Sequence, residues 1–395
     1  MDEKADVLII GGGVIGSAVA YFLAAEPNFA GTITVVERDP TYATSSTALS
    51  VASIRQQFST PENIRMSLFG AEFFRSAGQH LAVDGEAPDI AFRESGYLFL
   101  ASEQSLPVLQ SNHQTQIECG ATVALLTPAE LAQRFPWLAV DDLAAGSLGL
   151  ANEGWLDPYA LLQAFKQKAI SLGVRYRRDE VVALERQGNA LVAAELASGE
   201  KLEFAIAVNA AGPRAGRLAA LAGLELPVRA RKRIVHVIDC PQPISDCPLV
   251  IDPTGLYFRP EGQTFLSGIS PPADQDPDQD PDRDRLEVDN DLFETIWPLL
   301  ARRVPAFETL KLQRTWAGYY AYNTLDQNAI LGPHPEVENF ILANGFSGHG
   351  LQQSPAVGRA LSELITFGSY ATLDLSRFGC ERIIEQKPVR ELNVV

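Results

Sequence analysis

The sequence predicts an α/β protein in which one discontinuous domain with a parallel sheet is threaded through a second, α+β domain built on a mostly antiparallel sheet. Strands alternate with helices in three separated blocks, near the start, the middle and the end of the chain. Between these blocks the strands alternate apolar and polar residues, as antiparallel strands with one solvated or cavity-lining face do. We therefore predict a first domain formed by residues 1–84, 152–226 and 326–395, and a second formed by residues 85–151 and 227–325.

The composition is that of a globular protein and excludes several classes. Of the 395 residues 46% are apolar, and the net charge of -17 leaves no electrostatic footprint for nucleic acid. The four cysteines form no Cys-x-x-Cys pair and have no His cluster beside them, so we expect reduced thiols and no metal site. No apolar run approaches the ~18 residues that a membrane span needs. We expect a cytoplasmic protein with no transmembrane segment, whose membrane contact would be peripheral, at the inner membrane.

The first block reads as a strand–helix–strand unit. Residues 5–10 are almost all apolar, which is typical of a fully buried parallel strand, and residues 14–25 follow the helical period. Residues 32–37 form the second buried strand. The spacing is that of a βαβ unit.

Later elements follow from the same patterns. We predict helices at 61–80, 127–135, 158–172 and 355–367, strands at 96–100, 205–209, 234–238, 256–259 and 340–343, and a hairpin across 181–196. The segment 271–285 is rich in Pro and Asp, so we expect an exposed loop with no packing role.

A glycine-rich turn, Gly11-Gly12-Gly13-Val14-Ile15-Gly16, joins the first strand to its helix. In this context Gly11 allows the tight turn, Gly13 lets the backbone approach a pyrophosphate, and Gly16 lets helix and strand pack closely. The helix N-terminus, at Val14 and Ile15, offers free N–H groups to the phosphates. Glu37, about 20 residues further on, is placed to accept hydrogen bonds from the adenosine ribose, and Arg38 follows it. These features predict a Rossmann-like dinucleotide site.

NAD and FAD share this fingerprint, and two later segments favour FAD. A hydroxyl-rich stretch follows the second strand, and its Ser45, Ser46 and Ser50 can hold the phosphates and the flavin side. Near the C-terminus a second glycine-rich turn precedes a helix, where N–H groups and a positive helix end stabilise the charge of reduced flavin. Its candidate ligands are Gly345, Gly348, His349, Gly350, Leu351 and Gln352. On the adenosine side we expect Asn209, Ala211, Gly212 and Val182.

Together the three motifs resemble the D-amino-acid oxidase, sarcosine oxidase and glycine oxidase superfamily of flavoproteins, over nearly the whole chain. Further segments resemble one member group, the mitochondrial FAD-dependent oxidoreductase domain-containing protein linked to assembly of respiratory complex I. No mitochondrial leader is recognisable, so we expect a bacterial relative of that group. The segments are 54–58, 61–64, 153–158, 304–311, 316–320 and 345–353.

The resemblance implies oxidation of a small amine or amino acid, with hydride transfer from the carbon that bears nitrogen to flavin N5 and hydrolysis of the imine. Where sarcosine-oxidase-type members carry a substrate-binding Lys, this chain has Gln352, which puts a simple sarcosine-like substrate in doubt. Covalent members attach flavin through a Cys or a His. The matching Cys position is Tyr319, and residues 45–55 contain neither residue, so we expect non-covalent FAD.

For the chemistry we choose Arg55 first, because it follows the hydroxyl stretch and a guanidinium can grip a carboxylate with two parallel bonds. His349 lies inside the second glycine turn and is placed to contact flavin or substrate. Tyr320 and Tyr322 alternate on a strand and share one face. Arg259 is a second carboxylate candidate.

Three functions remain open from the sequence. The first is FAD-dependent oxidation of an amine or amino acid, with oxygen, a quinone or a protein as electron acceptor. The second is a flavoprotein assembly factor for a respiratory complex, with little catalysis. The third is FAD-dependent oxidation of a 2-hydroxy acid, which the same fold hosts.

Overall fold

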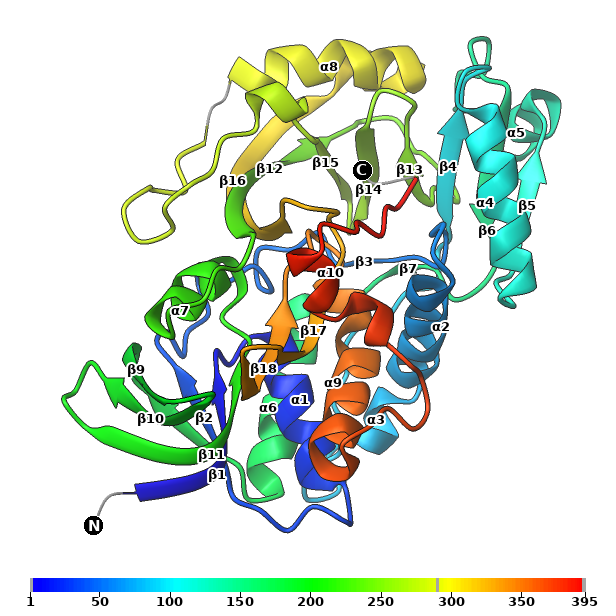
Figure 1. The fold of residues 1–395 in the computed structure, drawn as a ribbon. Coiled ribbons are helices and arrows are strands. Elements are labelled where there is room, and N and C mark those ends of the chain that lie inside the picture. Colours follow the sequence, from blue (N-terminus) through cyan, green and yellow to red (C-terminus); the bar gives the residue numbers. More distant parts are fainter. Residues whose placement is uncertain (1–2, 289–290, 393–395) are drawn as a thin grey trace.

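The computed structural model describes residues 3–288 and 291–392 and contains two large sheets, one in the lower and one in the upper half of Figure 1. The lower sheet consists of β1 (Glu3–Ile10), β2 (Ile33–Glu37), β8 (Arg175–Arg178), β9 (Val181–Gln187), β10 (Ala190–Leu196), β11 (Lys201–Asn209), β17 (Ile330–His334) and β18 (Val337–Asn344). Its main path runs β17-β18-β11-β1-β2-β8, and β9 and β10 extend from β11 as a hairpin.

The parallel strands of this sheet end along one edge. Ile10 at the end of β1 is opposite Val36 on β2 and Asn209 on β11, and Asn209 is opposite Leu342 on β18. In a doubly wound sheet, ligands bind outside the carboxyl ends of the strands. This edge is therefore where a site is expected.

Helices cover the lower sheet on one face, and the hairpin and a short helix cover the other. The helices are α1 (Val14–Ala25), α2 (Pro61–Arg75), α3 (Ala77–His80), α6 (Pro158–Ser171), α7 (Ala215–Leu221), α9 (Gly350–Phe367) and α10 (Glu381–Ile384). Helix α1 packs against both α6 and α9, side by side in Figure 1. Leu23 and Phe165 between them are fully excluded from solvent. Burial of each such side chain contributes roughly 1.5–3 kcal/mol to folding.

The upper sheet follows the order β16-β12-β15-β14-β13-β4-β6-β5. Every pairing is antiparallel except that of β13 with β4. The strands are β4 (Tyr97–Ala101), β5 (Val123–Leu126), β6 (Ala145–Gly149), β12 (Val228–Asp239), β13 (Leu249–Ile251), β14 (Leu256–Glu261), β15 (Thr264–Ile269) and β16 (Lys311–Asn323). Helices α4 (Leu106–Glu118), α5 (Pro128–Arg134) and α8 (Asp291–Arg303) pack around it. A small ladder, β3 (Ser53–Ile54) with β7 (Gly154–Trp155), joins the first two blocks of the chain.

The predicted fold class is confirmed, with differences at particular elements. The helix expected at 61–80 breaks at Ser76, and the final helix begins at Gly350 although Pro355 lies inside it. Each strand of the lower sheet falls within 1–84, 152–226 or 326–395, and each strand of the upper sheet falls within the two other ranges. We keep these boundaries as a proposal. Within the described ranges, no helix is long and apolar enough to cross a membrane.

The expectation that 271–285 has no packing role is wrong. Residues 276–287, here called the strap, are fastened to the protein by ion pairs, although many of their side chains are exposed. Asp276 pairs with Arg233, and Asp282 pairs with Arg38, Arg214 and Arg217. The arginines that hold the strap lie far away in the sequence, so the local composition gave no sign of these contacts.

Candidate active site

A cavity of about 710 Å³ runs along the carboxyl edge of the lower sheet, between the sheet and the strap. Its first end is the glycine turn. Gly11 has a φ of +103°, and a Cβ there would lie 2.4 Å from the carbonyl oxygen of Ala210; a Cβ on Gly16 would lie 1.9 Å from that of Gly11. Only glycine fits these two positions, and within the turn Gly11 and Gly13 line the cavity. Thr47 Oγ1 accepts from Val14 N at 3.2 Å and braces the turn.

Glu37, Arg38 and Val182 all line this cavity. Glu37 Oε2 accepts from Gly12 N and Glu37 Oε1 from Asp39 N, both at 2.8 Å. Burial raises the pKa of this carboxyl group above its ordinary value. Each oxygen keeps a further lone pair, which suits ribose hydroxyls.

The hydroxyl stretch and the second glycine turn line the other end. Ser45, Ser46 and Ser50 reach the cavity, and Ser46 Oγ donates to the carbonyl of Tyr319 at 2.5 Å. At Gly348, with a φ of +101°, a Cβ would lie 2.5 Å from the ring of Tyr320. Gly350, the first residue of α9, also lines the cavity.

Most of the predicted cofactor ligands line this cavity. They are Gly11, Gly13, Val14, Ile15, Glu37, Arg38, Ser45, Ser46, Ser50, Val182, Ala211, Gly212, Gly348, Gly350 and Leu351. The other predicted cofactor ligands, Gly16, Asn209, Gly345, His349 and Gln352, are not among the lining residues of this cavity. The side chain of Asn209 donates to the carbonyl of Ala215 at 3.0 Å and accepts from Ala211 N at 3.2 Å.

Other lining residues were missed. Thr44 and Thr47 belong to the hydroxyl-rich stretch that was predicted to contact the cofactor, so the sequence could have indicated them as well. The strap residues Pro281 and Leu286 also line the cavity, and no sequence pattern marks them.

A smaller chamber of about 60 Å³ adjoins the end of the cavity at the second glycine turn. It shares Tyr320, Ser347 and Gly348 with the larger cavity. Its polar lining is concentrated in side chains that carry chemistry, namely Arg55, Tyr97, Arg233, Tyr257, Tyr320 and His349. Polar groups therefore converge in a small hollow beside the larger cavity.

Arg55 and His349 meet in this chamber, 294 residues apart in sequence. Arg55 Nη2 lies 2.9 Å from His349 Nε2, and because a guanidinium only donates, the imidazole nitrogen accepts. Burial, and secondarily the charge of Arg55, lowers the pKa of His349 to about 3, so the ring is neutral. The guanidinium carbon of Arg55 lies 4.4 Å from the ring centre of Phe58 and 5.1 Å from that of Phe99. Arg55 is therefore held in place by aromatic faces and a neutral acceptor.

A buried carboxyl group supports the backbone behind Arg55. Glu153 accepts from Gln56 N at 2.6 Å and from Gln57 Nε2 at 2.8 Å. Burial raises the pKa of Glu153 to about 7. On the opposite side, Gln352 Oε1 accepts from Arg55 N at 2.8 Å. Gln352 therefore holds the backbone of Arg55, although it does not line the cofactor cavity.

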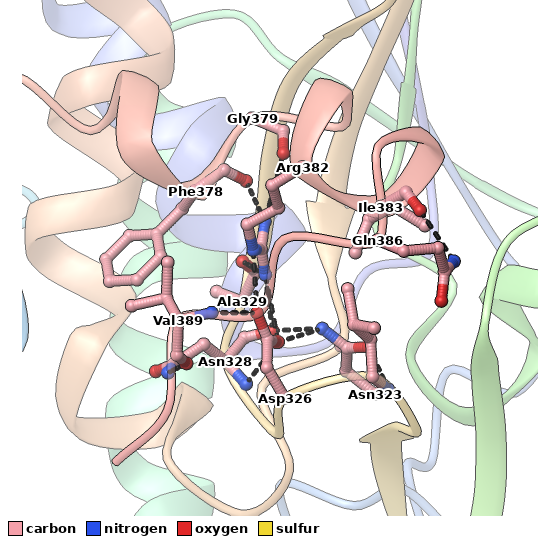
Figure 2. Close-up of polar contacts among 12 residues, drawn as sticks. Asn323, Asp326, Asn328, Ala329, Phe378, Gly379, Arg382, Ile383, Gln386 and Val389 are labelled. Atoms are coloured by element: carbon pink, nitrogen blue, oxygen red, sulfur yellow. Dashed lines mark hydrogen bonds and ion pairs between the residues drawn. The ribbon is translucent and has the colours of Figure 1, made fainter.

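The C-terminal segment braces the chain that follows Arg55. Figure 2 shows Arg382 reaching Asp326, with Nε 2.8 Å from Oδ2, and Asn328 donating to the carbonyl of Val389 at 2.6 Å. A few residues further on, the carboxylate of Glu391 accepts from Ser59 N at 2.7 Å.

The remaining predicted residues have different outcomes. Tyr320 and Tyr322 share one face of β16, because the guanidinium of Arg233 lies 5.1 Å and 5.9 Å from their ring centres. Only Tyr320 is among the lining residues of the chamber. Arg259 lines neither hollow: its Nη2 donates to the carbonyl of Val51 at 2.8 Å and its guanidinium lies over Trp155. The structure therefore gives no support to Arg259 as a substrate ligand.

A long cavity on a Rossmann-like sheet, with a small chamber at its far end, fits the FAD-dependent oxidoreductase that the sequence predicts. The chain belongs to the DAO family, FAD dependent oxidoreductase, whose match covers residues 6–364. FAD is therefore its cofactor, and the glycine positions and the Glu37 carboxylate described above fit it. Tyr319 and the serines that line the cavity are consistent with non-covalent binding, which stays a prediction.

Three relatives illustrate the range of the family. FAD-dependent oxidoreductase domain-containing protein 1 of Xenopus laevis is 46% identical over 429 residues, covering 100% of this chain and 85% of that protein. Glycine oxidase of Bacillus subtilis is 25% identical and covers 92% of this chain and 94% of its own. The crystal structure of L-proline dehydrogenase from P. horikoshii superposes with a TM-score of 0.86 and 26% identity, covering 98% and 100%. The predicted family resemblance is confirmed.

Proposed function

We propose that this protein oxidises the C–N bond of a small α-amino acid, and that Arg55 holds the substrate carboxylate. The observation that carries the proposal is the buried Arg55 guanidinium in a small chamber that adjoins the cofactor cavity. The names of two relatives, glycine oxidase and L-proline dehydrogenase, support an amino-acid substrate.

The chain's own groups then have separate tasks. Arg55 fixes the carboxylate by a charge-assisted fork, and its aromatic neighbours and His349 keep the guanidinium oriented. FAD would supply the acceptor for the hydride that leaves the carbon bearing nitrogen, once the substrate ammonium has lost a proton to solvent water, and water would then hydrolyse the imine. Because His349 is neutral, it adds no second positive charge and does not repel a substrate ammonium. Tyr320, between the two hollows, shapes the passage and limits substrate size.

The test is anaerobic reduction of the bound flavin, followed by its absorbance. Glycine, sarcosine and L-proline are compared with the 2-hydroxy acids glycolate and lactate. Bleaching by an amino acid and not by its hydroxy analogue is expected. Bleaching by the hydroxy acids alone would contradict the proposal, and no bleaching by either class, with FAD bound, would favour a flavoprotein assembly role with little catalysis.

Two variants locate the carboxylate. Arg55→Met is expected to raise the KM about 100-fold or more with FAD retained, because the charge-assisted fork is lost. Arg55→Lys keeps the positive charge but cannot form two parallel bonds, so its KM is expected to lie between those of wild type and Arg55→Met. Unchanged kinetics in Arg55→Met would remove Arg55 from substrate binding.

A further inference from the structure

Residues 385–392 of the C-terminal segment contact the turn before helix α2. Val389 N donates to Oδ2 of Asp326 at 3.0 Å, and the carbonyl of Val389 accepts from Asn328 at 2.6 Å (Figure 2). These two bonds fix the backbone two residues before Glu391. The side chain of Glu391 is thereby brought to the chain that follows the chamber residues in the sequence.

The carboxylate of Glu391 accepts four hydrogen bonds at this turn. Its Oε2 accepts from the backbone N and the Oγ of Ser59, each at 2.7 Å. Its Oε1 accepts from Thr60 N at 3.1 Å and from Asn63 Nδ2 at 2.6 Å. Thr60 is the N-cap of α2, and its own side chain makes no capping hydrogen bond within the described chain. Glu391 therefore places a negative charge at the start of α2, where the helix dipole favours one.

The turn that Glu391 holds follows directly on Phe58, which packs against two residues of the chamber. The guanidinium carbon of Arg55 lies 4.4 Å from the ring centre of Phe58, and the ring of His349 meets Phe58 edge to face at 5.2 Å. Phe58 is fully buried. Because a closely packed ring cannot move alone, a shift of the backbone at Ser59 is passed on to both chamber residues.

A second path leads from Glu391 to the chamber through Asn63. Asn63 Oδ1 accepts from Gln353 Nε2 at 3.0 Å. The neighbouring Gln352 accepts from Arg55 N at 2.8 Å. The carboxylate of Glu391 is thus connected to the backbone on both sides of the Arg55 side chain.

We propose that Glu391 is a positioning residue of the substrate chamber, which holds Phe58 against Arg55 and His349 without touching the substrate. This inference rests on the proposed function, because it takes the chamber as the place where Arg55 binds the substrate carboxylate. Glu391 sets the orientation of the guanidinium, and the chemistry stays with the groups inside the chamber. Loss of the carboxylate is expected to weaken substrate binding more than it slows hydride transfer.

Glu363 supplies a matched control. Its carboxylate accepts from Ala371 N at 2.9 Å, from Thr372 N at 3.1 Å and from Thr372 Oγ1 at 2.7 Å, so it also holds a turn by two backbone N–H groups and a hydroxyl. Glu363 lies roughly 20 Å along α9 from Gly350, the end of the helix that lines the cofactor cavity. Glu391→Gln and Glu363→Gln remove the same charge, and each puts an amide N–H against hydrogen-bond donors.

The ring of His349 gives a readout that needs no substrate. The chain contains five histidines, so NMR of FAD-loaded protein labelled with ¹⁵N-histidine resolves few ring signals, and His349→Gln assigns that of His349. Glu391→Gln is expected to shift the His349 ring signals, because the contacts of the ring with Arg55 and Phe58 change. Glu363→Gln is expected to leave them at their wild-type positions.

Anaerobic flavin reduction by an amino acid that bleaches wild type measures the consequence for the substrate. Glu391→Gln is expected to raise the half-saturating concentration about threefold to tenfold, because a displaced guanidinium loses part of its charge-assisted fork. The limiting rate of reduction is expected to stay within about twofold of wild type, since no group that contacts the substrate is removed. Glu363→Gln is expected to match wild type in both quantities.

The outcomes separate this inference from the proposed function. Unmoved His349 signals in Glu391→Gln overturn the positioning role, and so do equal shifts in Glu363→Gln. A shift with an unchanged half-saturating concentration denies Glu391 a role in substrate binding. A shift confined to Glu391→Gln supports the positioning role even where no amino acid bleaches wild type, a result that contradicts the proposed function alone. If Glu391→Gln does not fold, Ser59→Ala removes one of the four hydrogen bonds and is judged by the same signals.

Discussion

The glycine turn and the strap both form walls of the cofactor cavity, and they are held there in opposite ways. The turn is fixed by backbone contacts: Gly11 N donates to the carbonyl of Val36 at 2.9 Å, and Gly16 lies against Gly11. The strap is fixed by side-chain ion pairs, with the carboxylates of Asp276 and Asp282 each reached by arginines of other segments.

This difference explains why the glycine turn could be predicted from the sequence and the contacts of the strap could not. A position at which any Cβ would clash must be occupied by glycine, so the residue type itself indicates the constraint. A charged side chain looks the same in a sequence whether it is solvated or paired, because its partner can lie anywhere along the chain. Four measurements test how backbone crowding, buried charges and exposed ion pairs contribute to stability and to FAD binding.

The largest effect on FAD binding is expected at the glycine turn. In Gly11→Ala the new Cβ meets the backbone of Ala210, and the positive φ adds strain, so we expect bound FAD to fall more than about 100-fold and stability to fall by roughly 1–3 kcal/mol or more. FAD content after gel filtration and the Tm measure this. Gly85→Ala is the control, because Gly85 also has a positive φ of +87° but nothing lies within 4 Å of its Cβ position. Equal losses in both variants would show that strain alone, and not crowding, disables the turn.

A large loss of stability is expected when the buried ion pair between Arg382 and Asp326 is broken. Arg382 and Asp326 are 6% and 0% exposed, so Arg382→Met leaves an uncompensated buried carboxylate and is expected to cost about 3–5 kcal/mol of unfolding free energy. Arg377→Met breaks the pair with Glu62, in which Arg377 is 53% exposed, and is expected to cost about 0–1 kcal/mol. Denaturant unfolding compares the two. Similar costs would contradict the view that burial sets the strength of these pairs.

A pH effect of intermediate size is expected at Glu153. Its folded pKa of about 7 lies above the unfolded value of 4.5, so its stabilising contribution is complete below pH 4.5 and is lost as the pH rises through 7. Wild type is expected to lose on the order of 2–3 kcal/mol relative to Glu153→Gln over this window. Parallel unfolding curves at pH 5 and pH 8 measure the difference. Identical pH dependence in the two proteins would rule out a buried, protonatable Glu153.

The smallest effect is expected at the strap. Asp282 and its partners are partly exposed, with Arg217 66% exposed, so the contacts are screened by solvent. Asp282→Ala is expected to speed FAD release about threefold to tenfold, and high salt is expected to do the same to wild type. Flavin fluorescence follows the release. Arg283→Ala removes a strap charge that is 87% exposed and is expected to leave the rate unchanged; an equal acceleration there would deny Asp282 a specific role.

Much of the fold and of the cofactor site could be predicted because the signals are local. The strand, glycine turn and helix of residues 3–25 and the carboxylate of Glu37 are within one βαβ unit, and the helix bounds 14–25 match the structure. Helices α4 and α8 were missed. The bend of the chain at Ser76 also depends on packing that no local pattern shows.

The parallel-sheet domain and the FAD cofactor could be inferred from the sequence alone, because glycine positions and buried strands are constrained by their immediate neighbours in the chain. Tertiary structure alone decided which charged groups meet. It brought Arg55 to His349, turned Arg259 toward the carbonyl of Val51, and set Asp276 on Arg233. Such pairings depend on how distant segments pack and on where each long side chain points, and neither is fixed by the residues next to it in the chain.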